Sequence, residues 1–203
     1  MYDLNKSQIM ELFQFDNAAK VISAAYIASS SGNVQTGDVV HLSFPGSNGD
    51  CHVKSGHINN AESYVIKIAS GFYDNPSKGL PSSNGMMLAF SASTGEPKAI
   101  LRDEGWLTDM RTGIGGAVAT KALAAKNAEK VLIIGSGIQA QFQAKCLASL
   151  MPERPFNFNI WGRNTSAAAA LAEELRGYNL NADVATNLDE EVPLADIIIT
   201  TTP

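Results

Sequence analysis

The sequence predicts an α/β protein built from two parts that meet near residue 125. Residues 1–125 contain short apolar or alternating runs separated by turn-rich pieces, which is typical of an antiparallel or mixed sheet. Residues 126–203 alternate regularly between strand and helix patterns, which favours a parallel sheet with right-handed crossovers. We therefore expect an α+β domain over 1–125 and the N-terminal part of a parallel-sheet domain over 126–203.

The first part opens with two helical patterns, over 7–13 and 17–29, and Asp16 is the expected N-cap of the second. Five short strands are expected after them, over 39–44, 52–58, 64–69, 86–92 and 98–101. The residues between the last two strands, 93–97, are typical of a hairpin connection. Strands this closely spaced favour antiparallel pairing.

A third helix is expected over 108–125, and three glycines stand inside it, at 113, 115 and 116. Each glycine costs a helix about 1 kcal/mol relative to alanine. A helix that carries three of them needs a close backbone approach to something. That partner is either a neighbouring helix or a bound ligand.

The second part begins with a strand over 131–135, a helix over 139–150 and a strand over 156–161. A helix over 166–176 follows, with Gly177 as its expected C-terminal cap. Two further strands are expected, near 183–186 and over 197–202.

The composition of the 203-residue chain excludes several classes of protein. Hydrophobic residues make up 45% and charged residues 17%, so an intrinsically disordered chain is excluded. The net charge is −5 and no run of five basic residues occurs, so we expect neither nucleic acid nor a membrane surface as partner. No signal peptide is recognisable, and the two isolated cysteines, Cys51 and Cys146, are typical of reduced thiols in a cytoplasmic protein.

The strongest motif is G-x-G-x-x-A, formed by Gly135, Gly137 and Ala140 directly after a predicted strand and at the start of a helix. Its first glycine permits a tight turn, the second lets a pyrophosphate approach the backbone, and the small third residue allows close helix–strand packing. Phosphate then lies at the helix N-terminus. The motif predicts a dinucleotide site in a Rossmann-type domain; the alternative is a glycine turn that only reverses the chain.

The end of the next strand distinguishes NAD from NADP in such sites. An acidic residue there binds the ribose 2′-hydroxyl, whereas an arginine accommodates a 2′-phosphate. This chain has Gly162, Arg163 and Asn164 and no acidic residue, so we expect NADP(H) rather than NAD(H). The alternative is that Arg163 is an ordinary exposed arginine in a loop, with no role in cofactor binding.

Two cations stand out elsewhere. Lys67 interrupts the apolar strand pattern YVIKIA, so it either extends its ammonium group to solvent or lines a functional cleft. Arg111, on the glycine-rich helix, either pairs with Asp109 or binds an anion. His52 and His57 are five residues apart, which places them on opposite faces of one strand, and we predict no metal site.

Three segments together resemble the ornithine cyclodeaminase/mu-crystallin family: YVIKIASGFYDNPSKGLPSSNGMMLAFSASTGEPKAIL (64–101), LTDMRTG (107–113) and VLIIGSGIQAQFQA (131–144). The resemblance covers essentially the whole chain. Within the family, GFYDNPSKGLPSSNG and WLTDMRT are most similar to the cyclodeaminase-like proteins of ectoine utilisation. The resemblance implies a sheet domain that forms dimers and binds substrate, followed by a Rossmann domain with a nicotinamide cofactor.

The resemblance also implies roles for individual residues. Lys67 matches the active-site lysine beside the substrate carboxylate, and Arg111 matches the arginine that contacts substrate and cofactor. We expect these two side chains to face one cleft at the mouth of the fingerprint helix. His41 stands where many members have an arginine that clamps a substrate carboxylate, so it is expected to bind substrate more weakly. The implied cofactor-binding residues are Ser82, Arg111, Thr112, Gly135, Gly137, Ile138, Gln139, Arg163, Asn164 and Thr202.

The activity implied is nicotinamide-dependent conversion of an amino acid, through an imino acid, with release of ammonia, as from ornithine to proline. Two enzymatic alternatives use the same residues: reduction of a ketimine or imino acid, and amino-acid dehydrogenation. A non-catalytic protein that binds a small ligand together with the cofactor is the alternative from another class. The implied partners are a small amino or imino acid and a second copy of the chain.

The family pattern continues for roughly another hundred residues beyond position 203, and that stretch carries a catalytic aspartate and further Rossmann strands. We therefore expect this chain to be truncated at its C-terminus. A chain that ended at residue 203 is expected to be inactive by itself and prone to aggregation, because its last strand would expose an unpaired apolar edge.

Overall fold

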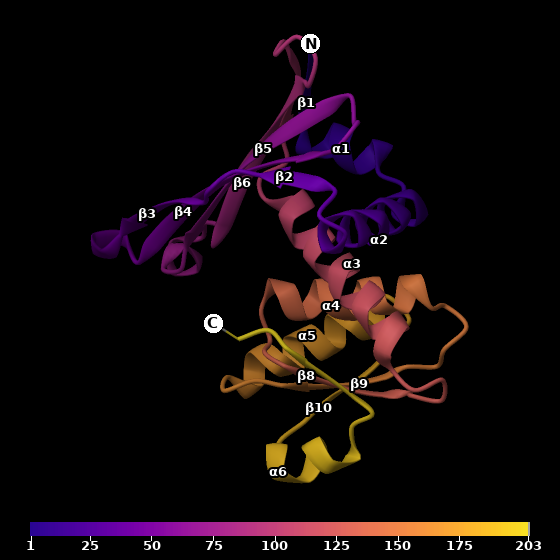
Figure 1. Ribbon diagram of the computed structural model, residues 1–203. Helices are drawn as coiled ribbons and strands as arrows, with labels where there is room; N and C mark the ends of the chain where they lie inside the picture. The colour runs from indigo at the N-terminus through magenta and orange to yellow at the C-terminus, as the bar shows by residue number, and fades with distance from the viewer. Residues whose placement is uncertain (203) are drawn as a thin grey trace. The chain divides into compact units, whose positions relative to one another are not determined.

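The computed structural model describes residues 1–202 (Figure 1). The chain forms two compact units, Met1–Thr108 and Asp109–Pro203. The helix α3 (Trp106–Leu123) therefore begins in the first unit and continues in the second. The division of the chain into domains 1–125 and 126–203 stays a prediction.

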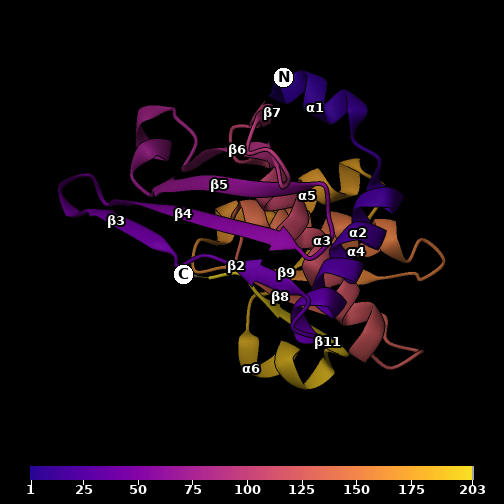
Figure 2. The ribbon, with the colours of Figure 1, turned by 45° about the horizontal axis from the view of Figure 1, so that its top comes forward.

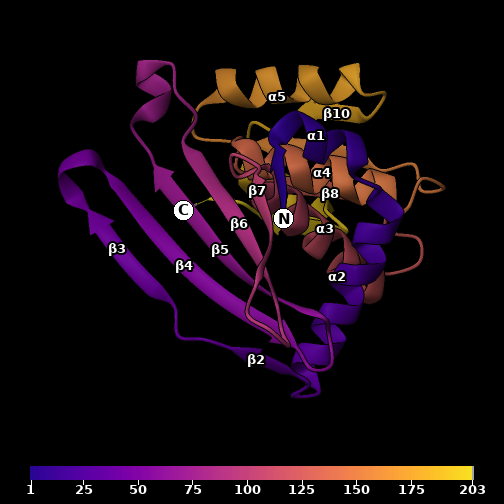
Figure 3. The same cartoon turned by 90° about the horizontal axis from the view of Figure 1, so that it is seen from above.

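The first unit contains a seven-stranded mixed sheet within the described residues. Its strand order is β1-β7-β6-β5-β4-β2, and β3 also pairs with β4. Only β1 and β7 are parallel, and the other pairs are antiparallel. Figures 2 and 3 show β3, β4, β5 and β6 side by side. The strands are β1 (Tyr2–Asn5), β2 (Val34–Thr36), β3 (Val40–Phe44), β4 (Gly49–Ile58), β5 (Ser63–Phe72), β6 (Ser83–Ser91) and β7 (Pro97–Arg102).

Two helices lie between β1 and β2 in the chain. The helix α1 (Lys6–Leu12) begins with a capping box, in which the Asn5 side chain accepts from the backbone N–H of Gln8 and the Gln8 side chain accepts from that of Asn5. The helix α2 (Phe15–Ser30) does not begin at Asp16 as predicted. Its N-cap is Gln14, and Asp16 lies inside the first turn, where a carboxylate is favoured by the helix dipole.

The second unit contains a four-stranded parallel sheet in the order β10-β9-β8-β11. All three neighbouring pairs are parallel, as the strand–helix alternation predicts. This order is that of the first strands of a Rossmann sheet. The strands are β8 (Lys130–Ile134), β9 (Asn157–Trp161), β10 (Asn181–Val184) and β11 (Ile197–Thr200), and the helices are α4 (Ile138–Leu150), α5 (Thr165–Gly177) and the short α6 (Leu188–Glu191).

Several element ends in this unit differ from the expectation by one or two residues, among them the end of α5 and the start of β10. Gly177 is the last residue of α5, and Tyr178 rather than Gly177 is the C-cap. The left-handed residue at this helix end is Asn179, with φ 59°, and not Gly177. The N–H of Asn179 donates to the carbonyl of Arg176 and that of Leu180 to the carbonyl of Leu175, so asparagine takes the position predicted for glycine. The strand β10 begins at Asn181, two residues before the expected start, because it pairs from its first residue with Asn157 at the start of β9.

Burial is concentrated in the second unit. The central strands β8 and β9 bury Val131, Leu132, Ile133, Phe158 and Ile160, as expected for a parallel sheet covered on both faces. The helix α5 buries one stripe with helical spacing, formed by Ala168, Leu171, Ala172 and Leu175. In contrast, Ile9 and Ala19 are the buried hydrophobic residues of the first unit within the described chain. The strands β4 to β7 are mostly half-buried, and β3 is exposed throughout.

Asp196 joins the start of β11 to the start of β8. Its Oδ2 accepts hydrogen bonds from the backbone N–H groups of Glu129 at 3.0 Å and Lys130 at 2.9 Å. These two bonds favour the carboxylate form and lower the pKa of Asp196. None of the described helices is both long enough and apolar enough to cross a lipid bilayer.

Candidate functional site

The glycine turn after β8 is the structural centre of the second unit's site. Gly135 has φ +130°, a backbone conformation that residues with a side chain rarely adopt. A Cβ atom placed on it would lie 3.1 Å from the backbone carbonyl of Thr201 and would clash with the Thr201 hydroxyl. The Gly135 N–H donates to the carbonyl of Trp161 at 2.7 Å. The turn is thus packed between the ends of β9 and β11, and glycine is required there.

Gly137 differs from Gly135, because it faces open space. It is the N-cap of α4 and has an extended backbone, with φ −90° and ψ −172°. Apart from its two chain neighbours, no described residue has an atom within 4 Å of the position that a Cβ would occupy. No side chain forms a capping hydrogen bond at this helix end, which leaves the first N–H groups of α4 without a side-chain acceptor. An open cradle at an uncapped helix N-terminus fits a pyrophosphate group.

The two fingerprint residues after Gly137 have different surroundings. Ile138 is exposed at the start of α4. The Gln139 side chain donates through Nε2 to Asp109 Oδ1 at 2.7 Å, and its Oε1 is buried with no hydrogen-bond partner among the described residues. The Gln139 side chain therefore links α4 to α3 by a hydrogen bond. The backbone N–H of Gln139 is the group that could contact a pyrophosphate.

The loop after β9 lies against the glycine turn. A Cβ on Gly162 would lie 2.8 Å from the Ser136 hydroxyl, so the two loops are in close contact. The Asn164 side chain caps α5 by accepting from the N–H of Ala167 at 3.1 Å. Arg163 is exposed, and its guanidinium forms no ion pair or hydrogen bond within residues 1–202. It is thus available to an anion next to the turn.

The glycine-rich face of α3 packs against α4. A Cβ on Gly113 would lie 2.7 Å from the backbone oxygen of Phe142 and 2.8 Å from Cys146 Sγ, and one on Gly116 would clash with the Gln143 side chain. Gln143 donates through Nε2 to the carbonyl of Thr112 at 3.1 Å. For Gly113 and Gly116, the close approach predicted from the sequence is therefore to a helix. Burial at this contact raises the pKa of Cys146 to about 12, so the thiol is protonated and unreactive.

We predict that Gly113→Ala lowers the free energy of unfolding by about 1–3 kcal/mol, because the new methyl group would overlap the backbone of α4. Helix propensity alone would give a gain of about 1 kcal/mol. Gly177→Ala is the matched control, since no described atom outside its chain neighbours and its own helix backbone lies within 4 Å of its Cβ position. Denaturant unfolding measures both variants, and a Gly113→Ala protein as stable as Gly177→Ala would contradict the packing.

Three further predicted residues lie in this unit. Arg111 is exposed on α3, and it forms no ion pair with Asp109 within the described chain. Thr112 follows it and is half-buried, while Thr202 is exposed after the end of β11. The neighbouring Thr201, rather than Thr202, packs against Gly135. The N–H of Thr201 donates to the carbonyl of Ile134 at 2.8 Å and so extends the pairing of β11 with β8.

In the first unit, strand register places the other predicted residues on one face of the sheet. His41 lies opposite His52, which lies opposite Ala69 on β5. Lys67 is two residues from Ala69, so its side chain is on the same face. Lys67 is half-buried, and it lies opposite Lys54 and Met87 in the register. We call the face that carries His41, Asp50, His52 and Lys67 the polar face.

A small pocket of about 210 Å³ lies in the first unit, and Asp50, His52, Ala69 and Ser83 are among the residues that line it. Tyr73 also lines it and donates to Asp50 Oδ2 over a long hydrogen bond of 3.4 Å. Burial and the Asp50 carboxylate both raise the pKa of Tyr73. Ser82, expected at the cofactor, is half-buried and does not line this pocket, although the next residue, Ser83, does. The Ser82 carbonyl accepts from the N–H of Phe72 at 2.7 Å.

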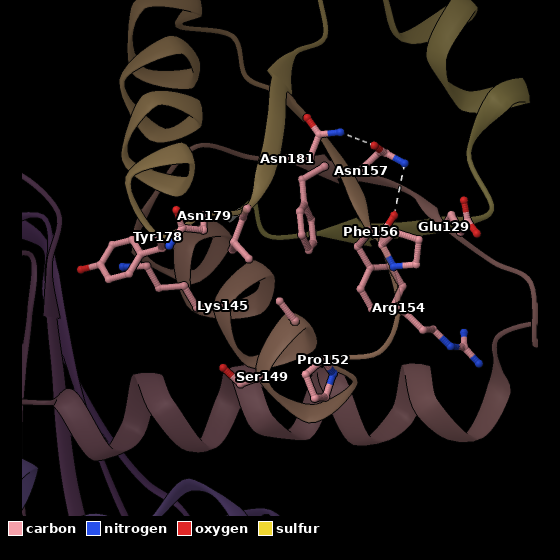
Figure 4. A pocket seen from close by; sticks show the side chains of 14 residues that line it. Glu129, Lys145, Ser149, Pro152, Arg154, Phe156, Asn157, Tyr178, Asn179 and Asn181 are labelled. Atoms are coloured by element: carbon pink, nitrogen blue, oxygen red, sulfur yellow. Dashed lines mark hydrogen bonds between the residues drawn. The ribbon is translucent and has the colours of Figure 1, made fainter.

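A second pocket, of about 680 Å³, lies in the second unit (Figure 4). It is lined by Asn157 and Asn181 at the starts of β9 and β10, and these two side chains are hydrogen-bonded to each other. Ligands of open parallel sheets bind at the carboxyl ends of the strands. This pocket is at the amino ends, so it is not the dinucleotide site.

The parallel sheet and its glycine turn define the second unit as a Rossmann-type fold, preceded by a mixed-sheet unit. Residues 3–203 match the model of the ornithine cyclodeaminase/mu-crystallin family, and the chain belongs to this family. A similar curated relative is the uncharacterised cyclodeaminase y4tK of Sinorhizobium fredii, which is 36% identical over 98% of this chain. The chain spans 61% of the length of that relative.

Two solved structures show the same fold over the whole chain. One is the Δ1-pyrroline-2-carboxylate reductase of Thermococcus litoralis in complex with NADH and L-proline, with a TM-score of 0.89 and 26% identity. The other is an archaeal alanine dehydrogenase dimer with bound NAD, with a TM-score of 0.85 and 26% identity. The chain covers 62% and 61% of these structures, respectively. The predicted fold class and family are thereby confirmed.

Proposed function

We propose that the whole protein is a nicotinamide-dependent enzyme that converts an amino acid through an imino acid with release of ammonia, in the manner of ornithine cyclodeaminase. One observation carries the proposal: the open cradle at Gly137 lies at an uncapped helix N-terminus in a chain of this family. When bound, the nicotinamide would accept a hydride from the substrate's α-carbon and return it.

The chain's own residues would bind and orient the reactants. The backbone of residues 135–139 would hold the pyrophosphate at the start of α4. Lys67, on the polar face, would bind the substrate carboxylate with its ammonium group. Arg111 is an exposed guanidinium with no ion pair in the described chain, and it would bind an anionic group of substrate or cofactor.

A second candidate is the reduction of a cyclic imine such as Δ1-pyrroline-2-carboxylate. It is supported by the likeness to the Thermococcus litoralis reductase, which was solved with NADH and L-proline. The expected preference for NADP(H) also favours a reduction that consumes the cofactor. Amino-acid dehydrogenation is supported in the same way by the alanine dehydrogenase likeness.

One assay distinguishes these activities in the complete protein. Ornithine, proline, alanine and pyrroline-2-carboxylate are each supplied with NAD(P)⁺ or NAD(P)H, and both nicotinamide absorbance and ammonia are followed. Ammonia release without net absorbance change supports the cyclodeaminase. Net cofactor oxidation with the imine supports the reductase, and net cofactor reduction with an amino acid supports a dehydrogenase. Tight cofactor binding with no turnover would contradict all three and favour a ligand-binding protein.

We propose further that the cofactor is NADP(H), because Arg163 is exposed, unpaired within residues 1–202 and next to Gly162 at the glycine turn. Arg163→Ala is expected to weaken NADP(H) binding by about 10–100-fold, the value of a charge-assisted phosphate contact, and to leave NAD(H) binding nearly unchanged. Fluorescence titration with both cofactors measures this. Equal weakening of both would contradict a role at the 2′-phosphate.

A homodimer is also proposed. The face of the first sheet opposite the polar face exposes Val40, Leu42, Phe44 and Met86, with 52%, 50%, 41% and 37% of their surfaces accessible. A contiguous exposed apolar face is typical of an interface between protein chains. The alanine dehydrogenase with the same fold is a dimer, which supports a second copy as the occupant. Light scattering on the complete protein tests this, and a monomer at micromolar concentration would contradict it.

A further inference from the structure

Three potential metal ligands meet on the polar face at the paired strands β3 and β4. His41 and His52 are directly opposite in the register, and their rings are stacked with centroids 4.6 Å apart. Asp50 Oδ1 lies 3.6 Å from His52 Nδ1. One ligand atom from each of the three residues lies within 4.8 Å of the other two. The polar face thus brings two imidazoles and one carboxylate to a single point.

The two imidazoles stack on each other, but no hydrogen bond joins the three groups to one another. Within residues 1–202 neither imidazole takes part in a hydrogen bond, and 3.6 Å is too long for one between Asp50 and His52. Asp50 is held through its other oxygen, since Tyr73 donates to Oδ2. Its Oδ1 is thereby turned toward the histidines. A hydrogen-bonded outer partner of this kind is the usual support of a ligating carboxylate.

We propose that His41, His52 and Asp50 bind a divalent transition-metal ion of the Zn²⁺ class. Neutral imidazole and carboxylate are ligands that Zn²⁺ accepts, at about 2.0–2.2 Å. Ligands at that distance in a tetrahedron are about 3.3 Å apart, so small side-chain rotations bring the three groups into range. Three protein ligands leave one position open to water or an anionic oxygen, as in sites of the two-histidine, one-carboxylate type.

The other potential ligands on these strands are excluded by strand alternation. Cys51 lies between Asp50 and His52, so its side chain is on the opposite face of β4. His57 is on that opposite face too, and its Nε2 contacts the carbonyl of Ala61 at 3.0 Å. The proposed donor set is therefore two nitrogens and one oxygen, without sulfur. This composition favours Zn²⁺, Co²⁺ or Ni²⁺ over the oxygen-ligated Mg²⁺ and Ca²⁺.

Calorimetric titration of the full chain with Zn²⁺ alone tests the proposal. We expect saturable binding of one ion per chain, weakened more than about 100-fold in His41→Gln and in Asp50→Asn, because even outer partners of metal ligands are worth about 10–100-fold. Tyr73→Phe removes such an outer partner and is expected to weaken binding by about 10-fold. His57→Gln is the matched control, a histidine of the same strand that should leave the affinity unchanged.

Two outcomes would overturn the proposal: absence of saturable Zn²⁺ binding by the wild-type chain, and an equal loss of affinity in His57→Gln and His41→Gln. Circular dichroism of each variant identifies a loss that is due to unfolding. Visible absorption of the Co²⁺-loaded chain gives a second readout, because its bands report the ligand set directly. They should change in His41→Gln and stay unchanged in His57→Gln, and the reverse would contradict the assigned ligands.

Discussion

Replacing Lys67 with alanine is expected to lower kcat/KM of the complete protein by about 100–1,000-fold, because removing one partner of a desolvated charge pair costs about 2–5 kcal/mol. Lys67 is half-buried on the polar face, in a strand whose pattern is otherwise apolar. We expect its ammonium group to hold the substrate carboxylate, so both kcat and KM should be affected. Steady-state kinetics with the substrate identified by the assay above measure the effect.

Lys98→Ala is the matched control. Lys98 also lies on a strand of the first sheet, but its side chain is 42% exposed and pairs with Glu62 at 3.7 Å. An exposed pair of this kind contributes roughly 0–1 kcal/mol to stability, so the control should keep nearly full activity. A Lys67→Ala protein that is folded and as active as Lys98→Ala would remove the catalytic assignment.

The second large effect concerns the two glycines of the turn, which we expect to respond differently to the same added methyl group. Gly135→Ala should lower the free energy of unfolding by about 1–3 kcal/mol and abolish cofactor binding, because φ +130° is strained for alanine and Thr201 occupies the space. Gly137→Ala should leave stability unchanged, since its backbone is extended and its surroundings are open.

Gly137→Ala should nevertheless weaken cofactor binding by about 10–100-fold, because its methyl group would stand where the pyrophosphate approaches the helix. Thermal unfolding without cofactor and fluorescence titration with NADP(H) separate the two effects. If Gly137→Ala binds the cofactor normally, the open space is not the pyrophosphate cradle. If Gly135→Ala is as stable as the wild type, the turn does not require glycine.

Much of the second unit follows from local sequence. Val131, Leu132 and Ile133 precede a glycine turn and a helix, and a helix that returns the chain to the start of the next strand gives parallel pairing, as β8 and β9 show. The proposed dinucleotide site is local as well, since the backbone of residues 135–139 would supply its phosphate-binding groups. Helix ends were predicted less well: Asp16 is not the N-cap of α2, because Gln14 already has the extended backbone of a cap.

The sequence by itself determined the class of fold, the family and the position of the glycine turn, since each depends on residues that are neighbours along the chain. Only the tertiary structure decided which side chains meet across strands. The pairing of β3 with β4 brings His41 beside His52, a contact that spacing along the chain does not predict. The tertiary structure also shows that Gly113 and Gly116 accommodate α4 rather than a ligand. Register and helix packing depend on how distant segments fit together, and a one-residue shift of a strand would move every side chain to the other face.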